Sequence, residues 1–476
     1  MNITVTGADW NALAPLTIVA VAALVVLLAD LLSPKHANRY VAIGIALVGL
    51  IVAAVACGAA YGHDYAAFGG AFILGGFSVV FQEIILICAF GSILLYGTTG
   101  SPEHIPGAVA LMLWSTCGAM LMAGAGSLMT IFLGLELLSL ALYCLCGLSD
   151  RRTAREAALK YLILSSTASG FLLYGMALLF GASGSVALAD LVSPALASNP
   201  LLWLGGGMFL VGIAFKLSLV PFHTWSPDVY EGAPLPVTAF MSVATKAATL
   251  AVFARFIYAA LPAGVDRRLL LPVWIIAAIS MIAGNVGMLA QRDLKRLIAY
   301  SGIAQVGYIL TALAGGTPLG LRYAIYYIAA YTFMNLGAFA VASLLSDDAE
   351  QGSSLVNYRG LGRRRPVLAA LMTFFLLAMA GLPPTAGFLG KILILSTSVN
   401  AGFAWLGGVL IAGTAISLYA YAKVIFAMYA GDGHGHTRDV RPLAPLAWIS
   451  AVACFLLVLL MTFYPLTPSN VLPLVR

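Results

Sequence analysis

Charged residues are scarce in this sequence of 476 residues, since Asp, Glu, Lys and Arg together make up 9% of it. An ordinary soluble domain is about a quarter charged. Hydrophobic residues account for 62% of the chain, and its mean hydropathy is +1.00. The longest polar stretches, such as 346–365 and 431–441, are too short to fold on their own. These shortages exclude a soluble globular protein and leave no room for a soluble domain.

Cofactor and metal motifs are also missing from the sequence. Its six cysteines lie in apolar stretches without a CxxC or Cys/His spacing, which favours packing roles over metal sites or disulfides. There is no glycine-rich dinucleotide or phosphate loop, so any redox chemistry must take place elsewhere. The first ten residues lack the basic segment of a secretory signal, and we expect the apolar run that follows to be a retained span.

Apolar runs of about twenty residues dominate the sequence, and this length spans a hydrocarbon core of roughly 30 Å. The pattern predicts an all-α polytopic membrane protein, because spanning helices satisfy their own backbone hydrogen bonds. The seventh and twelfth spans should be broken helices, because Pro221 and the pair Pro383–Pro384 interrupt them. We expect about fourteen spans, at 12–32, 40–60, 73–96, 107–123, 127–148, 158–180, 201–220, 234–260, 270–290, 294–314, 320–345, 366–398, 403–429 and 443–464.

Basic residues beside the predicted spans are distributed unevenly between the two sides of the membrane. Fourteen follow odd-numbered spans, namely Lys35, Arg39, Arg151, Arg152, Arg155, Arg292, Lys295, Arg296, Arg359, Arg363, Arg364, Arg365, Arg438 and Arg441. Four lie on the other side, namely Arg267, Arg268, Arg322 and Arg476. The positive-inside rule therefore predicts cytoplasmic odd-numbered loops and both termini outside. The net charge of +6 reflects this topology and does not indicate a nucleic-acid partner.

Ionisable residues within the predicted spans carry the functional signal. A charge at the bilayer centre costs roughly 2.5–3.5 kcal/mol on insertion scales, so each such residue needs a reason. The acid of interest is Glu136, since we expect structural or interfacial roles for Asp30 and Glu83. The bases are Lys160, Lys216, Lys246, Arg255, Lys391 and Lys423. Lys160, Arg255 and Lys423 lie close enough to span ends for their charges to reach the interface. Lys216, Lys246 and Lys391 have less access to either surface, which leaves proton transfer or interhelical hydrogen bonding.

The two broken helices suggest an internal repeat. Five predicted spans over 107–260 and five over 270–430 each contain an interrupted helix with a lysine close to the break. Five helices per unit give successive units opposite topology, which is the inverted-repeat design of secondary transporters. We therefore divide the chain into three N-terminal helices (1–106), two inverted repeats (107–260 and 270–430) and a C-terminal helix (443–476).

A buried lysine and a nearby carboxylate can form a gated proton-transfer pair. Burial favours loss of the lysine proton, and an adjacent carboxylate favours its retention. Glu136 and Lys216 are the predicted pair, Lys246 the central relay and Lys391 the far terminal. Bridging water could be held by polar neighbours, which could equally be packing residues, namely Ser139, Ser218, Thr245, Tyr326, Tyr327, Tyr331 and Asn335.

Four segments resemble the antiporter-like membrane subunits of bacterial NADH:quinone oxidoreductase, or respiratory complex I. They are 215–234 (FKLSLVPFHTWSPDVYEGAP), 244–248 (ATKAA), 293–308 (DLKRLIAYSGIAQVGY) and 381–391 (GLPPTAGFLGK). The similarity runs from about Leu13 to Pro465. The sequence PDVYEGAP and the lysine at 391 look like the N-type members of that family rather than the M-type.

This resemblance implies a non-redox, proton-translocating subunit in a bacterial inner membrane, in which the count of basic residues would place both termini in the periplasm. It implies that Glu136 and Lys216 pair in a first half-channel, that Lys160 modulates the pair, that Lys246 is central and that Lys391 belongs to a second half-channel. M- and K-type subunits, lipids, protons and internal water are the implied partners. Flavin, iron–sulfur clusters and quinone would lie in partner subunits, with no cofactor or metal in this chain.

One position departs from the family pattern, since many relatives have His where this chain has Gln305. An amide can align water but cannot accept a proton near neutral pH. We expect either that water replaces the imidazole or that the route avoids the tenth span.

Other functions are compatible with parts of this sequence. A subunit of a multi-subunit cation/proton antiporter would share the motifs, although the N-type form of 216–246 argues against it. A stand-alone metabolite transporter should offer specific polar anchors rather than a line of lysines. A structural spacer would leave four buried ionisable residues, at about 10 kcal/mol of combined insertion cost, unexplained.

Overall fold

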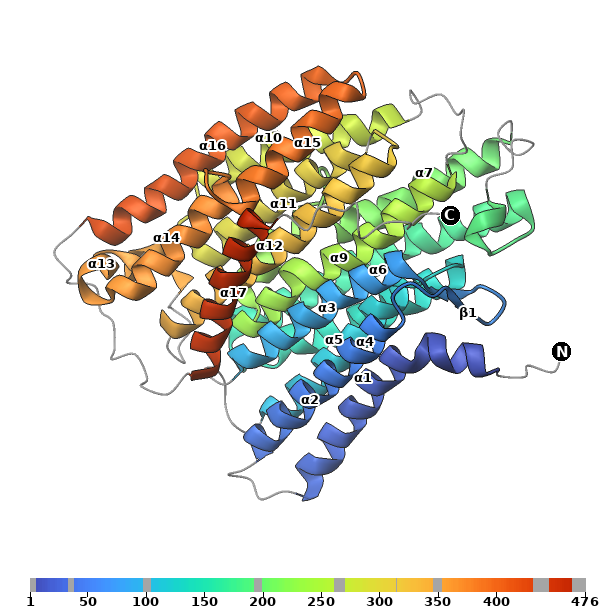
Figure 1. Ribbon diagram of the computed structural model, residues 1–476, viewed down its shortest axis with the longest axis horizontal. Helices are drawn as coiled ribbons and strands as arrows, with labels where there is room; N and C mark the ends of the chain where they lie inside the picture. Colours follow the sequence, from blue (N-terminus) through green and yellow to red (C-terminus); the bar gives the residue numbers. More distant parts are fainter. Residues whose placement is uncertain are drawn as a thin grey trace.

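The computed structural model describes residues 6–32, 38–96, 104–191, 199–260, 270–313, 315–345, 353–430 and 445–464, which form a bundle of long helices lying alongside one another (Figure 1). The long helices are α1 (Gly7–Leu32), α2 (Asn38–Ala59), α3 (Gly76–Leu95), α4 (Ile105–Ala123), α5 (Leu128–Gly147), α6 (Arg152–Ser183), α9 (Leu235–Ala260), α10 (Leu271–Leu289), α11 (Leu294–Leu313), α12 (Pro318–Leu345), α16 (Ala404–Tyr429) and α17 (Pro445–Phe463). Shorter helices are α7 (Pro200–Lys216), α8 (Trp225–Gly232), α13 (Leu361–Arg364), α14 (Pro366–Ala380) and α15 (Ala386–Asn400).

Twelve of the described helices are long and apolar enough to cross a membrane, which confirms the predicted all-α membrane class. The predicted seventh span corresponds to α7, and the short helix α8 follows it beyond the break, whereas the predicted twelfth span is divided into α14 and α15. The total of fourteen spans, the inverted repeats and the domain boundaries stay predictions. Lys35, Arg267, Arg268, Arg438, Arg441 and Arg476, which entered the count of basic residues, lie outside the described residues.

Both breaks lie close to the expected prolines. In the first, α7 ends at Lys216 and α8 begins at Trp225, with a cis peptide before Pro221 between them. The predicted span 201–220 continued past this end, because residues 217–220 are mostly apolar and hydropathy does not detect where the helix stops. In the second, Gly381 has a φ of 83° and closes α14, as glycine commonly does after a helix.

A short hairpin precedes α3 where the sequence predicted the beginning of a span. Strands β1 (Tyr65–Ala67) and β2 (Phe72–Leu74) pair antiparallel, and α3 begins two residues after β2. The predicted start at residue 73 was therefore slightly early, because Phe72, Ile73 and Leu74 are as apolar as a helix end.

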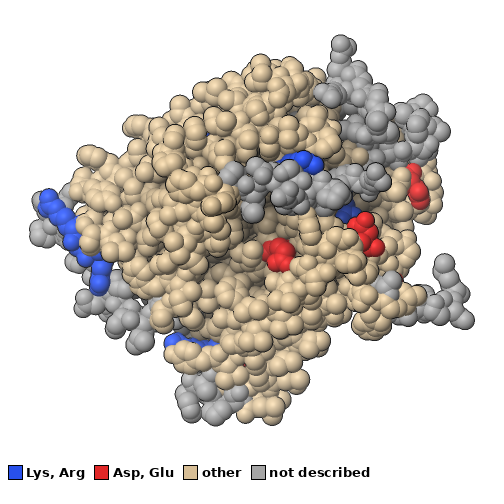
Figure 2. All heavy atoms as spheres, in the orientation of Figure 1, with Lys and Arg blue, Asp and Glu red and all other residues tan. Residues whose placement is uncertain are grey.

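The enclosed helices of the bundle are α9, α11 and α12, and α1, α2, α16 and α17 lie at its periphery (Figure 1). All residues in the most apolar part of α9 are buried inside the protein, whereas only 33% are buried in each of the outer helices. The face in Figure 2 is mostly neither acidic nor basic, as expected for a surface that meets lipid. This arrangement places Lys246, which lies on α9, at the centre of the protein.

Candidate functional site

Lys216 is the last residue of α7, and its side chain is buried against α5 and α6. Its Nζ donates hydrogen bonds to Ser139 Oγ at 2.7 Å and to Ser165 Oγ at 2.6 Å. The ammonium also lies 5.0 Å from the centre of the Tyr161 ring. Because α7 ends here, the Lys216 side chain sits at a helix C-terminus, where partial negative charge favours a cation.

Glu136 lies on α5, one turn before Ser139, and accepts a hydrogen bond of 2.6 Å from Ser169 Oγ. Ser165 and Ser169 are one turn apart on α6, so the two serines face Lys216 and Glu136 in succession. Among the ion pairs of the described residues there is none between Glu136 and Lys216. Each predicted partner is instead hydrogen-bonded to its own serine on α6, Glu136 to Ser169 and Lys216 to Ser165.

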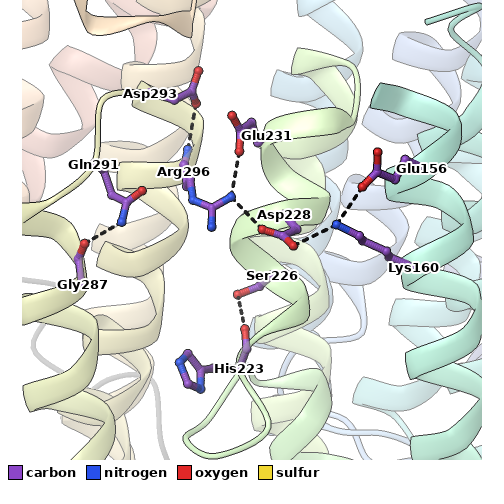
Figure 3. Close-up of polar contacts among 10 residues, drawn as sticks. All are labelled: Glu156, Lys160, His223, Ser226, Asp228, Glu231, Gly287, Gln291, Asp293 and Arg296. Atoms are coloured by element: carbon purple, nitrogen blue, oxygen red, sulfur yellow. Dashed lines mark hydrogen bonds and ion pairs between the residues drawn. The ribbon is translucent and has the colours of Figure 1, made fainter. Parts of the chain in front are cut away.

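Lys160 lies apart from the Lys216 group and closer to the surface, with its side chain 43% exposed. It forms ion pairs with Glu156 at 2.9 Å and with Asp228 at 3.1 Å (Figure 3). Asp228 also accepts a bond of 2.7 Å from Arg296, which contacts Glu231 at 2.8 Å. This network joins α6, α8 and α11 at one end of the bundle.

The Lys160 network lines a cavity of about 670 Å³, which we call the charged cavity; its walls include Glu156, Lys160, Asp228, Glu231 and Arg296. Burial raises the pKa of the Asp228 carboxyl, but the hydrogen bonds and charges of Lys160 and Arg296 lower it by more, so the net shift is downward. Asp228 is therefore a carboxylate at neutral pH. The cavity is lined by both acidic and basic groups.

Lys246 is buried in the middle of α9, and its Nζ lies 5.7 Å from the centre of the Tyr331 ring. Gly302 on α11 leaves room for this ammonium, because a Cβ at that position would overlap Lys246 Nζ. The Tyr331 hydroxyl and both amide atoms of Asn335 are buried and have no hydrogen-bond partner in the described part of the chain. Buried polar groups of this kind are usually satisfied by water.

Lys391 lies on α15 and faces the end of α14 across the second break. Its Nζ donates to the Ala380 carbonyl at 2.9 Å and lies 4.7 Å from the centre of the Tyr308 ring. Gln305 Nε2 donates to the preceding carbonyl, that of Met379, at 3.1 Å, and Gln305 Oε1 accepts from the Tyr327 hydroxyl. The last carbonyls of a helix have no partner within the helix. Lys391 and Gln305 supply two of those partners here.

The structure also shows polar residues that the sequence did not single out, and it gives some of the expected residues other partners. Ser165 and Ser169 were not singled out, although their spacing of four residues puts two hydroxyls on one helix face. Asp228 and Arg296 were seen only as motif and loop residues, and nothing in the sequence indicated that they meet. Among the expected water-holding residues, Ser139 contacts Lys216, whereas Tyr326 donates to the Met461 carbonyl on α17. Arg255 donates to Ser78 Oγ at 2.6 Å within the protein.

Comparison with known proteins gives consistent matches over most of the chain. A family profile described as "NADH:quinone oxidoreductase/Mrp antiporter, TM" matches residues 125–418. NADH-quinone oxidoreductase subunit N of Trichlorobacter lovleyi is 40% identical over 447 residues, which cover 92% of this chain and 91% of that protein.

Solved structures with a similar fold include chains of respiratory complex I and of an Mrp complex. A chain of respiratory complex I from Thermus thermophilus has a TM-score of 0.82 and 33% identity, over 95% of this chain and 97% of that one. A chain of the Mrp complex from Dietzia sp. has a TM-score of 0.81 and covers 96% of this chain and 95% of that one, but at 20% identity it is similar in fold alone.

Proposed function

This chain belongs to the NADH:quinone oxidoreductase/Mrp antiporter membrane-subunit family, and we propose that it moves protons along its buried lysine and glutamate side chains. It is a proton-translocating subunit of the membrane arm of an NADH:quinone oxidoreductase, with subunit N proteins as relatives. It is thus a non-redox part of a translocase.

The main support for the proposed route is that three lysines are buried inside the helix bundle. The side chains of Lys216, Lys246 and Lys391 are each at most 4% exposed. A buried ammonium is tolerated only when it is hydrogen-bonded or when it can lose its proton. All three lie beside helix ends or hydroxyl groups that can stabilise either state.

In the proposed route, Glu136 and Lys216 act as the paired groups of the first half. Ser139 and Ser165 can hold the Lys216 ammonium when it is charged and leave it when it is neutral, because a hydroxyl both donates and accepts. Ser169 donates to the Glu136 carboxylate. Lys246 is the central relay, next to the buried Tyr331 and Asn335 groups that favour water. Lys391 is the relay of the second half.

Gln305 suits a positioning role in this route, since it cannot carry a proton near neutral pH. Its amide group links the end of α14 to Tyr327, which fixes the second break beside Lys391. Lys160 belongs to the charged cavity and acts on the Glu136–Lys216 pair from there, through α6.

The proposed surroundings are those of the membrane arm. The chain partners with other membrane subunits of a respiratory complex, and we assign M- and K-type subunits as its two neighbours. Flavin, iron–sulfur clusters and quinone belong to partner subunits in this assignment. The excess of basic residues after odd-numbered spans supports cytoplasmic loops there and periplasmic termini in a bacterial inner membrane.

The experiment that tests the route uses the assembled complex with Glu136→Ala or Lys216→Ala. We expect quinone reductase activity coupled to pumping to fall at least about tenfold while assembly persists, as removal of a proton-transfer group costs about 10²–10⁴-fold in the step it serves. Asp150→Asn, which changes an exposed carboxylate that does not line the charged cavity, is the matched control. Full coupled activity in both alanine variants would contradict the route.

A further inference from the structure

An aromatic stack connects the surroundings of Lys216 to the helices that line the charged cavity. Tyr161 and Trp225 stack with ring centres 4.8 Å apart and planes 7° apart. The Tyr161 ring also contacts the Lys216 ammonium, and Trp225 Nε1 donates to the Phe215 carbonyl at 2.8 Å. Both aromatic side chains are at most 2% exposed. The stack is therefore buried and lies directly against Lys216.

The two stacked rings come from α6 and α8, and the same two helices supply Lys160 and Asp228, which form an ion pair in the charged cavity. Tyr161 follows Lys160 on α6, and Trp225 precedes Asp228 by three residues on α8. The Lys160–Asp228 ion pair therefore holds together the two helices that the stack joins (Figure 3). Asp228 has a second cationic partner in Arg296 on α11, so it keeps a charge partner if Lys160 moves away.

A polar group inside the stack indicates where water could pass. The Tyr161 hydroxyl is buried and has no hydrogen-bond partner among the described residues. A buried hydroxyl without a partner is costly, and water is its usual partner. Separation of α6 from α8 would give this hydroxyl access to the water of the charged cavity.

We propose that the charged cavity is where protons are taken up for the first half of the route, and that the Tyr161–Trp225 stack is the gate between this cavity and Lys216. The Lys160–Asp228 ion pair holds the gate shut. When the pair opens, water enters beside Tyr161, and one proton passes from a hydronium ion in the cavity to neutral Lys216, with no other bond changed. This assignment rests on the proposed function, since it names the uptake side of the same route.

The test measures whether water-soluble reagents reach Lys216, independently of pumping. A cysteine is placed at Ser165, which contacts Lys216, in the assembled complex with exposed Cys144 changed to serine. The complex is held in lipid nanodiscs, which leave both faces open, and labelling by a charged methanethiosulfonate is timed. We expect slow labelling with the gate intact, about tenfold faster labelling in Trp225→Ala, and an increase in Asp228→Asn.

Three controls separate gating from general loosening. Trp225→Phe keeps an aromatic ring and should label slowly. Glu156→Gln removes only the partner of Lys160 within α6 and should also label slowly. A cysteine at Ser301, which contacts Tyr421 in the second half, should not respond to Trp225→Ala.

Unchanged labelling at position 165 in both Trp225→Ala and Asp228→Asn would overturn the gate, as would an equal increase at position 301. The result does not depend on proton transfer through Lys246 or Lys391. Failure of the gate is therefore distinguishable from failure of the proposed function, which is measured by pumping.

Discussion

At the residue scale, the surroundings of Lys216 explain how a charge is kept in an apolar bundle. Two serine hydroxyls from different helices accept hydrogen bonds from its ammonium. Hydrogen bonds to charged groups contribute about 1.5–3 kcal/mol each, which is comparable to the cost of inserting the charge. The serines therefore decide how easily Lys216 holds its proton.

Removing the Ser165 hydroxyl should disturb this balance. We expect Ser165→Ala to reduce coupled turnover by about tenfold, because one hydrogen bond to the ammonium is lost. Ser165→Thr keeps the hydroxyl and should restore most of the activity. NADH oxidation and proton uptake in proteoliposomes measure both variants, and equal activity of the alanine and threonine variants would show that the hydroxyl is not used.

Gly302 offers a second test at this scale, because its missing side chain makes room for Lys246 Nζ. We expect Gly302→Ala to leave the assembled complex as stable as before, since alanine favours a helix by about 1 kcal/mol over glycine. Pumping should nevertheless fall, up to about a hundredfold, because the ammonium is displaced from its place beside Tyr331.

The matched control for Gly302 is Gly408→Ala, at which a Cβ would meet open space. Thermal unfolding of the complex and the proton-to-electron ratio are measured for both variants. A Gly302→Ala complex that pumps normally would mean that the position of Lys246 Nζ does not matter.

At the element scale, the two broken helices were the part of the fold that the sequence predicted best. Proline cannot donate a backbone hydrogen bond, so Pro221, Pro383 and Pro384 predicted the interruptions correctly. The partners of the freed backbone groups could not be predicted, because they come from other helices. Gln305 on α11 and the Met379 carbonyl on α14 are 74 residues apart in the sequence.

Gln305→Leu should destabilise the second break, since it leaves the Met379 carbonyl and the Tyr327 hydroxyl without their partner. The cost is about 1–3 kcal/mol per buried group, measured as a lower midpoint of thermal unfolding for the complex. Gln305→His should recover stability, because a neutral imidazole has one donor and one acceptor. A histidine variant as unstable as the leucine variant would contradict this positioning role.

The ion pairs among α6, α8 and α11 make a prediction about pH. The pKa of Asp228 is lowered in the folded protein, so its contribution to stability is present above its unfolded pKa and is lost as pH falls through the folded value. The unfolded value is about 3.9. The difference in thermal stability between wild type and Asp228→Asn should therefore stay constant from pH 8 to pH 5. A difference that disappears within this range would contradict the assigned ion pairs.

At the scale of the whole molecule, composition and run length predicted the membrane class, and motifs predicted the family. The separation of the candidate residues was harder to predict. Lys160 and Lys216 were expected in one group, yet Lys160 lines the charged cavity and Lys216 lies behind an aromatic stack. Hydropathy shows where a residue lies along a predicted span. Whether its side chain is exposed depends on which neighbouring helices pack against it, and hydropathy does not show this.

The helix at the centre of the bundle, α9, carries Lys246. Lys246 is on α9, whose apolar part is completely enclosed, and the two halves of the chain lie around it (Figure 1). A lysine in this position has little structural reason to be there, because a leucine or methionine would pack without the cost of burying a charge. We therefore propose that proton transfer passes through Lys246.

The most direct measurement is the number of protons pumped per electron in the assembled complex with Lys246→Ala, reconstituted in proteoliposomes. Lys423→Ala, which changes an exposed lysine, is the control. We expect coupled turnover and pumping to fall at least about tenfold in Lys246→Ala, because a proton-transfer group is removed, and to stay unchanged in the control. An assembled Lys246→Ala complex with normal turnover and a normal proton-to-electron ratio would contradict it.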